Sequence, residues 1–308
     1  MPLRGKTLLT PLVLCCIVGL NLSLSAQDGT STGKCGFQNL TIHSPAGTTP
    51  GPTALNDKGS IVGFLNLGSA ANFRTVGFFQ SSQGAFSSFN FPGARDTVAH
   101  DINKNGLIVG TWDSPTINGD RAFKVLNGAF HQVTIPGFPN AQIAALGVND
   151  LGDIVGQFNN GTVLGFLLHN GKPTIISFPG AKGGTLAASI NDSGVVVGTY
   201  MLSDEDVPHG FMWKNGNFTN ITAPGGLPAR PARINNEGDI VGSFTDSHGV
   251  QHGFSLDKGR FTVIDHPSSK STSIFAVNDF DNILGDFVPS SSTTFSNVNF
   301  KGFCSAVF

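Results

Sequence analysis

The strongest constraint on the fold is a nine-residue phrase that the chain repeats six times. Copies begin at Leu55, Ile102, Val148, Ile190, Ile234 and Val277, and they read LNDKGSIVG, INKNGLIVG, VNDLGDIVG, INDSGVVVG, INNEGDIVG and VNDFDNILG. Successive copies start 47, 46, 42, 44 and 43 residues apart. A period of this length is typical of stacked repeat units or of propeller blades.

Each period predicts four short strands. A small or apolar run ending in Ile-Asn or its equivalent is followed by a turn and by a run such as VVVGTY. After a variable stretch come Gly-Phe or Ala-Phe, a tight turn such as KNGN, and a segment such as FTNITAPG. These runs are rich in Val, Ile, Phe and Thr and are bounded by Gly, Asn, Asp or Pro. The Asn-Asp-x-Gly turn predicts a hairpin whose Gly has positive φ, and the sixth copy has Asp281 there, the next most tolerant type.

Four-stranded units of about 45 residues have the size of a propeller blade. The sixth repeat reaches only its third strand, KGFCSAVF, whereas CGFQNLTIHSPAG near the other end matches the missing fourth strand. We therefore predict an all-β, six-bladed β-propeller of four-stranded blades. Its N-terminal strand, residues 37–45, completes the last blade beside residues 302–308 in a Velcro closure. An open β-solenoid is the alternative, and it would require capping units.

Two cysteines, Cys35 and Cys304, flank the predicted propeller. In an oxidising compartment such a pair is a disulfide candidate that would lock the seam. Simple alignment of the two strands places these cysteines slightly out of opposition, and two buried thiols are the alternative.

Residues 1–26 have the three parts of a secretory signal peptide, with Arg4 and Lys6 before an apolar run and small residues up to Ala26. A retained membrane anchor and a lipoprotein are the alternatives, but the apolar run is short for a span. We therefore expect a short linker at residues 27–34, a propeller at residues 35–308, and secretion to the medium or the periplasm.

Loss of the two basic residues of the signal peptide takes the formal net charge from −2 to −4. With no basic cluster to neutralise phosphates, nucleic acid is excluded as a partner, and we expect no membrane insertion after signal removal.

The run IN-x-x-G-x-IVG, a variable loop, HGF and GNFTNITAPG resembles the HAF-repeat family of bacterial extracellular proteins. The position that gives this family its name reads HGF at residues 209–211 and 252–254 and RAF at residues 121–123; the other three copies have neither His nor Arg there. The resemblance implies only secretion, because this family has no established activity.

His209 and His252 occupy equivalent positions in consecutive repeats and are weak metal-ligand candidates, with the acidic residues 204–206 nearby. Imidazole ligands need two or three convergent partners, so the favoured alternative is that each His caps a strand start and hydrogen-bonds a loop carbonyl. The DINKNG stretch at residues 101–106 begins like a calcium loop but lacks its closing acid, and we interpret it as a structural turn.

The residue before the recurring Ile-Asn pair, or its equivalent, should line the channel, and it is charged in two copies, Asp101 and Arg233. His100 and Arg230 lie close to them in the sequence, towards the same rim. An unpaired charge in a narrow channel is costly. Asp101 and Arg233 therefore either form a stabilising pair bridged through solvent or bind a polar ligand at the mouth.

The variable loops, to which Arg121 belongs, should share one face, where binding sites are common. We expect a secreted, noncatalytic binding module for an unknown extracellular ligand, a carbohydrate or a protein. Its candidate ligand-binding residues are Arg233, Asp101, Arg230, His100 and Arg121. The alternatives are a hydrolase or lyase acting on a polar extracellular polymer at the channel mouth, and a structural cell-surface protein. No linear catalytic motif is present, and we expect no cofactor.

Overall fold

The computed structural model describes residues 35–68, 73–116, 119–202, 207–291 and 298–304. The chain divides into residues 1–31 and residues 32–308, and only the second unit contains described residues. The predicted signal peptide, the linker and the acidic residues 204–206 lie outside them. In the described part of the chain, no helix has the length and apolar character needed to cross a membrane.

The described chain is all-β apart from one 3₁₀ turn, η1 (Pro224–Gly226). The first strands of the repeats are β2 (Thr49–Leu55), β6 (Asp96–Ile102), β10 (Gln142–Val148), β14 (Gly184–Ile190), β18 (Leu227–Ile234) and β22 (Ser269–Val277). The second strands are β3 (Ile61–Leu67), β7 (Ile108–Asp113), β11 (Ile154–Asn159), β15 (Val196–Met201), β19 (Ile240–Thr245) and β23 (Asn282–Pro289). The third strands are β4 (Arg74–Gln80), β8 (Arg121–Leu126), β12 (Val163–His169), β16 (His209–Lys214), β20 (Gln251–Asp257) and β24 (Val298–Cys304). The outer strands are β5 (Phe86–Phe89), β9 (Ala129–Val133), β13 (Lys172–Ile176), β17 (Asn217–Ala223), β21 (Arg260–Ile264) and β1 (Cys35–Asn39).

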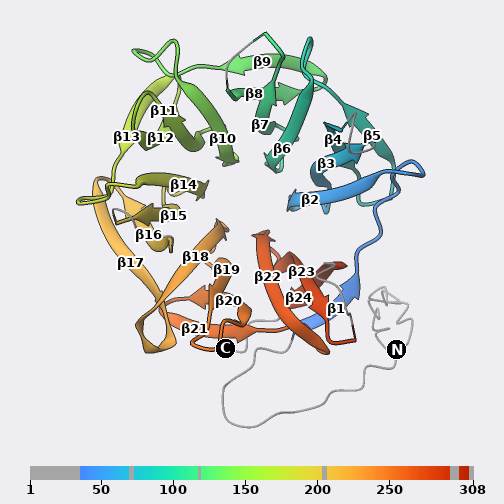
Figure 1. Cartoon of the computed structure of the whole chain (residues 1–308), viewed down its shortest axis with the longest axis vertical. Coiled ribbons are helices and arrows are strands. Elements are labelled where there is room, and N and C mark those ends of the chain that lie inside the picture. The colour runs from blue at the N-terminus through green and yellow to red at the C-terminus, as the bar shows by residue number, and fades with distance from the viewer. Residues whose placement is uncertain (1–34, 69–72, 117–118, 203–206, 292–297, 305–308) are drawn as a thin grey trace, which may run out of the picture. The chain divides into compact units, whose positions relative to one another are not determined.

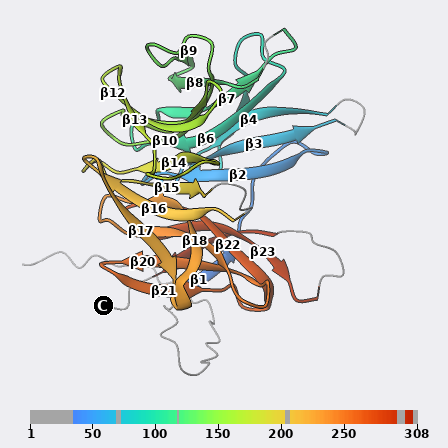
Figure 2. The ribbon, with the colours of Figure 1, turned by 60° about the vertical axis from the view of Figure 1, so that its left-hand side comes forward.

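These strands form antiparallel sheets whose first strands point towards a common axis (Figure 1). Four sheets have four strands, and a fifth has eight strands, β14 to β21. Inside the eight-stranded sheet, β17 and β18 are linked by only two residue pairs, Thr222 with Pro228 and Ala223 with Leu227. Figure 2, turned by 60°, shows successive sheets stacked face to face. The prediction of an all-β chain built from four-stranded antiparallel sheets is confirmed.

The strand nearest the described N-terminus, β1, pairs with β24 in the order β1-β24-β23-β22. The paired segment, Cys35–Asn39, begins earlier than the predicted residues 37–45. It is also shorter, because the chain leaves the ladder after a last hydrogen bond from Leu40 N–H to the Asn299 carbonyl. The register places Cys35 directly opposite Cys304. The alignment that put the two cysteines out of opposition is therefore wrong.

Hydrophobic clusters fill the spaces between neighbouring sheets. Each cluster combines residues of two consecutive repeats, and one of them joins Ala276 and Leu284 of the last repeat to Leu55 and Leu65 of the first. Both faces of a sheet are thus buried, because a four-stranded sheet shields neither face by itself.

A bulge in each first strand shapes the channel. The register between first and second strands shifts by one residue opposite the Gly of the IVG motif, for example between Ala99 and Asp101 opposite Gly110. A Cβ on Gly110 would overlap the Val98 carbonyl and reach 2.8 Å from the Phe123 ring. Glycine at this position therefore lets the bulged strand approach its neighbour closely.

Candidate functional site

The recurring Asn residues form a closed hydrogen-bonded ring around the axis. In every copy, Asn Oδ1 accepts the N–H of the residue four positions later, which fixes the turn. In every copy, Asn Nδ2 also donates to the carbonyl of the corresponding Asn in the next repeat, at 2.9–3.3 Å. The last of these bonds runs from Asn278 to Asn56. The Asn therefore serves both its own turn and the junction between repeats.

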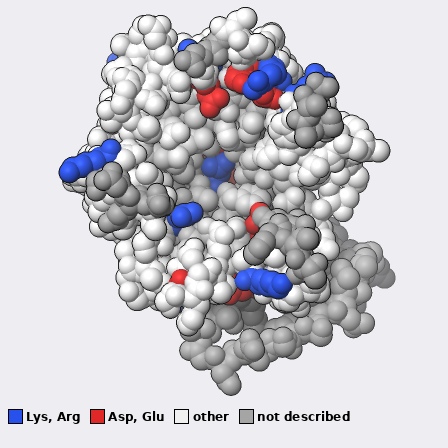
Figure 3. All heavy atoms as spheres, in the orientation of Figure 1, with Lys and Arg blue, Asp and Glu red and all other residues white. Residues whose placement is uncertain are grey.

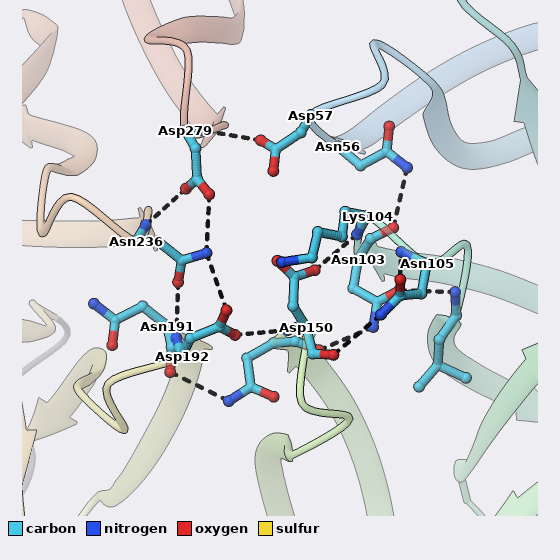
Figure 4. Close-up of polar contacts among 12 residues, drawn as sticks. Asn56, Asp57, Asn103, Lys104, Asn105, Asp150, Asn191, Asp192, Asn236 and Asp279 are labelled. Carbon is cyan, nitrogen blue, oxygen red and sulfur yellow. Dashed lines mark hydrogen bonds and ion pairs between the residues drawn. The ribbon is translucent and has the colours of Figure 1, made fainter.

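A second ring is formed by the residue that follows each Asn. Its members are Asp57, Lys104, Asp150, Asp192, Asn236 and Asp279. Five of the six donate their backbone N–H to the side-chain oxygen of the next member, at 2.7–2.9 Å, as Figure 4 shows for several of them. The ladder stops at Lys104, which has no side-chain oxygen to accept the N–H of Asp57. Its Nζ instead lies 2.9 Å from Asp150 Oδ2.

These two rings surround a cavity of about 70 Å³ at the axis. Asp101, Ser189 and Arg233 contribute to its lining. Oxygen atoms of Asp57, Asp150 and Asp279 lie within 4.8 Å of one another beside it. We call this cavity and the ring of six residues after the Asn residues the acidic mouth.

The acidic mouth has a net negative charge, since its ring holds four carboxylates against one ammonium group. Burial, followed by the negative charges of Asp279 and Asp150, raises the pKa of Asp57. Oxygen atoms at this spacing suit a hard cation or an ammonium group. Sequence reasoning treated these turns as structural only and missed this site. The available signal was the Asp that follows Asn in four of six copies, although Lys104 and Asn236 show that the turn itself does not require it.

Arg233 and Asp101, predicted to line the channel, meet directly. Arg233 Nη2 lies 3.4 Å from Asp101 Oδ1, and both side chains are about nine-tenths buried. The Asp101 carboxylate also accepts the N–H groups of Ile102 and Val148, at 3.0 and 2.9 Å. The pair thus forms by direct contact rather than by a solvent bridge.

The guanidinium of Arg233 also satisfies carbonyl groups that the bulges turn towards the axis. Its Nη2 donates to the His100 carbonyl at 2.5 Å, and its Nη1 donates to those of Leu146 and Ala188 at 3.2 Å. These three acceptors occupy the shifted positions of β6, β10 and β14. Arg233 therefore ties three other repeats to β18.

Burial and the charge of Arg233 lower the pKa of His100 to about 4, so its imidazole is neutral at pH 7. Its Nε2 lies 3.0 Å from Thr111 Oγ1. Burial raises the pKa of Asp101, an effect that Arg233 opposes. Three of the five candidates, Arg233, Asp101 and His100, are thus brought together.

The two remaining candidates lie on strands rather than in variable loops, Arg230 on β18 and Arg121 at the start of β8. Arg230 is exposed on β18, and Arg121 donates to the Asp120 carbonyl at 3.0 Å. Within the described residues, the polar partners of Arg233 include neither of them. Figure 3 shows that charged side chains gather in small groups around one face, with basic atoms at the base of its central hollow. Arg95 forms ion pairs with Asp96 and Asp113, at 2.7 and 2.8 Å.

The two metal candidates of the sequence differ in their surroundings. The ring of His209 stacks on Tyr200, with centroids 5.3 Å apart. His252 does not bond a loop carbonyl as expected, because its Nδ1 lies 2.9 Å from Asp265 Oδ2 and its Nε2 lies 3.5 Å from Asp246 Oδ2.

No family model and no curated protein matches this sequence. Among solved structures, the β-propeller domain of the Trilobed protease from Pyrococcus furiosus, which has an open Velcro topology, aligns with a TM-score of 0.50 and 8% identity over 82% of this chain and 95% of that one. The fold is propeller-like. TolB from Acinetobacter baumannii aligns with a TM-score of 0.49 and 11% identity over 80% of this chain, which spans only 64% of the TolB chain. The fucose-specific lectin from Aleuria aurantia aligns with a TM-score of 0.47 and 13% identity over 81% of this chain and 91% of that one. At such identities the likeness is one of fold alone.

Proposed function

We propose that this chain is an extracellular, noncatalytic binding β-propeller that holds a positively charged ligand group at the acidic mouth. The observation that carries this proposal is the convergence of Asp57, Asp150 and Asp279 within 4.8 Å beside the axial cavity. Lys104 already compensates the charge of Asp150, but mutual repulsion between the carboxylates of Asp57 and Asp279 remains, and a bound cation relieves it.

The architecture behind this proposal is a six-bladed ring with a Velcro closure. The two-pair link between β17 and β18 supports counting the eight-stranded sheet as two blades. The pairing of β1 with β24 and the hydrogen bond from Asn278 to Asn56 support closure of the last blade on the first. We also propose membership of the HAF-repeat family, on the repeat pattern.

Secretion through a cleaved signal peptide and a disulfide between Cys35 and Cys304 belong to the same proposal. Direct opposition of the two cysteines on paired strands supports the bond. Mass spectrometry of the secreted protein without reductant tests both points. We expect a mature chain beginning at Gln27 and a cross-linked peptide pair, and free thiols at both positions would contradict the disulfide.

Binding is favoured over catalysis because the charged groups at the axis are already engaged in contacts within the protein. Arg233 and Asp101, which an enzyme would use at the channel, are engaged with each other and with backbone groups. The carboxylates of the acidic mouth hold neighbouring backbone N–H groups. Such groups stabilise a fixed geometry for a ligand.

The proposal is tested by thermal unfolding of the mature protein with Ca²⁺ and, separately, with a lysine-rich peptide. A ligand at a hundred times its dissociation constant adds about 2.7 kcal/mol of stability, or several degrees at roughly 2–4 °C per kcal/mol. Asp57→Asn and Asp279→Asn should abolish the shift without unfolding the ring, because Asn236 shows that an amide oxygen can occupy this position.

The matched control is Glu237→Gln. Glu237 is an exposed turn residue that follows Asn236 of the ring, and the change removes one negative charge outside the acidic mouth. This variant should keep the shift. A protein that responds to neither probe, or whose response survives both Asp→Asn changes, would refute a cation site at the acidic mouth.

A further inference from the structure

The hairpin between β19 and β20 carries a cluster of metal-ligating side chains separate from the acidic mouth. Its sequence is DSHGVQH, residues 246–252. Asp246 Oδ1 accepts the N–H groups of His248 and Val250, both at 2.8 Å. Its other oxygen, Oδ2, lies 3.4 Å from His248 Nδ1 and 3.5 Å from His252 Nε2. One carboxylate oxygen thus faces two imidazole nitrogens.

These separations are long for hydrogen bonds, which between N and O fall at about 2.7–3.2 Å. They fit the edges of a tetrahedron around a metal ion instead. Ligand atoms bonded to Zn²⁺ at about 2.0–2.1 Å lie about 3.3–3.4 Å from one another. Two of the three ligand–ligand separations thus fit a coordination shell, and the third, between the imidazole nitrogens of His248 and His252, requires His248 to rotate.

The other ring nitrogen of His252 has the partner that a ligating histidine usually has. Its Nδ1 lies 2.9 Å from Asp265 Oδ2, on the chain that follows β21. The ring also stacks on Phe244, with centroids 5.2 Å apart and an interplanar angle of 28°. A proton held on Nδ1 by Asp265 leaves the lone pair of Nε2 directed towards Asp246, as in carboxylate–histidine–zinc arrangements.

Asp246 is suited to the role of an anionic ligand. The N–H groups of His248 and Val250 fix its Oδ1, which leaves Oδ2 facing the two imidazoles. Neutral imidazoles and a carboxylate are the donor set that Zn²⁺ and other late first-row metals accept.

We propose that Asp246, His248 and His252 bind a divalent transition metal ion such as Zn²⁺, with Asp265 orienting His252. The side chain of His248 is 85% exposed, so it can rotate to complete the site without displacing packed residues. Three protein ligands leave a fourth position for water or for a donor atom of an external ligand. The site is independent of the acidic mouth, whose three candidate ligands, Asp57, Asp150 and Asp279, are all carboxylates and suit harder cations.

The test uses the mature protein without an affinity tag, titrated with Zn²⁺ by calorimetry and with Co²⁺ by visible absorption. We expect one ion per chain and the intense d–d bands of tetrahedral Co²⁺. His248→Ala, which removes an exposed side chain, should weaken binding at least tenfold. Asp265→Asn should weaken it about 10–100-fold through the loss of orientation. Lowering the pH from 7.5 to 5.5 should weaken it further, because protons compete for the imidazoles.

His131→Ala is the matched control, since His131 is an exposed histidine on β9 in another repeat. This variant and Asp279→Asn should both bind Zn²⁺ as the unmodified protein does, which separates this site from the acidic mouth. Absence of Zn²⁺ binding would overturn the proposal. So would equal affinities in His248→Ala and His131→Ala, because the contacts of Asp246 would then be ordinary ion pairs.

Discussion

Replacement of Arg233 by Met is the most informative perturbation of the channel. The change removes three hydrogen bonds to carbonyl groups of other repeats and leaves Asp101 buried without an opposite charge. Breaking a buried ion pair in this way costs about 3–5 kcal/mol. At roughly 2–4 °C per kcal/mol, Arg233→Met should unfold about 6–20 °C below the unmodified protein.

The pH dependence of this loss has a defined sign. Burial already raises the pKa of Asp101, and removal of Arg233 takes away a charge that lowers it. A carboxyl whose folded pKa lies above its unfolded value is stabilising only when protonated, so its contribution is lost as pH rises. The deficit of Arg233→Met should therefore be largest at pH 7–8 and should shrink towards pH 4.

The assay is guanidinium unfolding of Arg233→Met, Asp101→Asn and the double variant, with a check that the slope m is unchanged. Because the two residues share one network, the double variant should lose about 0.5–3 kcal/mol less than the sum of the single variants. A loss below about 1 kcal/mol for Arg233→Met, or strict additivity, would refute the view that the pair is a buried clamp.

Three further outcomes are expected. Gly198→Ala should cost about 1–3 kcal/mol in chemical denaturation, because its Cβ would overlap the Leu186 carbonyl, whereas Gly36→Ala, with open space around it, should cost less. Asn278→Ala should cost at least about 2 kcal/mol by the same assay, since it removes the bond to Asn56 and leaves two turn N–H groups without their acceptor. Burial raises the pKa of Asp239 to about 6. The stability of the unmodified protein relative to Asp239→Asn should therefore fall between pH 4 and pH 6.5. A difference in melting temperature between the two proteins that stays constant across that range would contradict this.

Much of the fold could be predicted from local sequence patterns. Strand composition, the turn residues and a period near 45 residues predict four-stranded units because each depends on residues close together in the chain. The bounds of β1 were not predictable in this way. Its length depends on where the ladder with β24 ends, and that is decided by a partner more than 250 residues away.

The site was predicted in part. Asp101 and Arg233 stood out as charges at positions that are otherwise small, and the structure joins them at 3.4 Å. The acidic mouth was missed because each Asp is, by itself, an ordinary turn residue. Only the ring brings Asp57, Asp150 and Asp279 together.

The sequence by itself determined the repeating unit and the identity of the Asn that holds each turn, because these follow from local backbone chemistry. The tertiary structure alone decided where charge accumulates. The bulge in each first strand shifts its register by one residue. This shift turns the carbonyl of the bulged residue and the side chain of the next residue towards the axis. Arg233 can therefore reach carbonyl groups 45, 87 and 133 residues away, and no pattern along the chain encodes those distances.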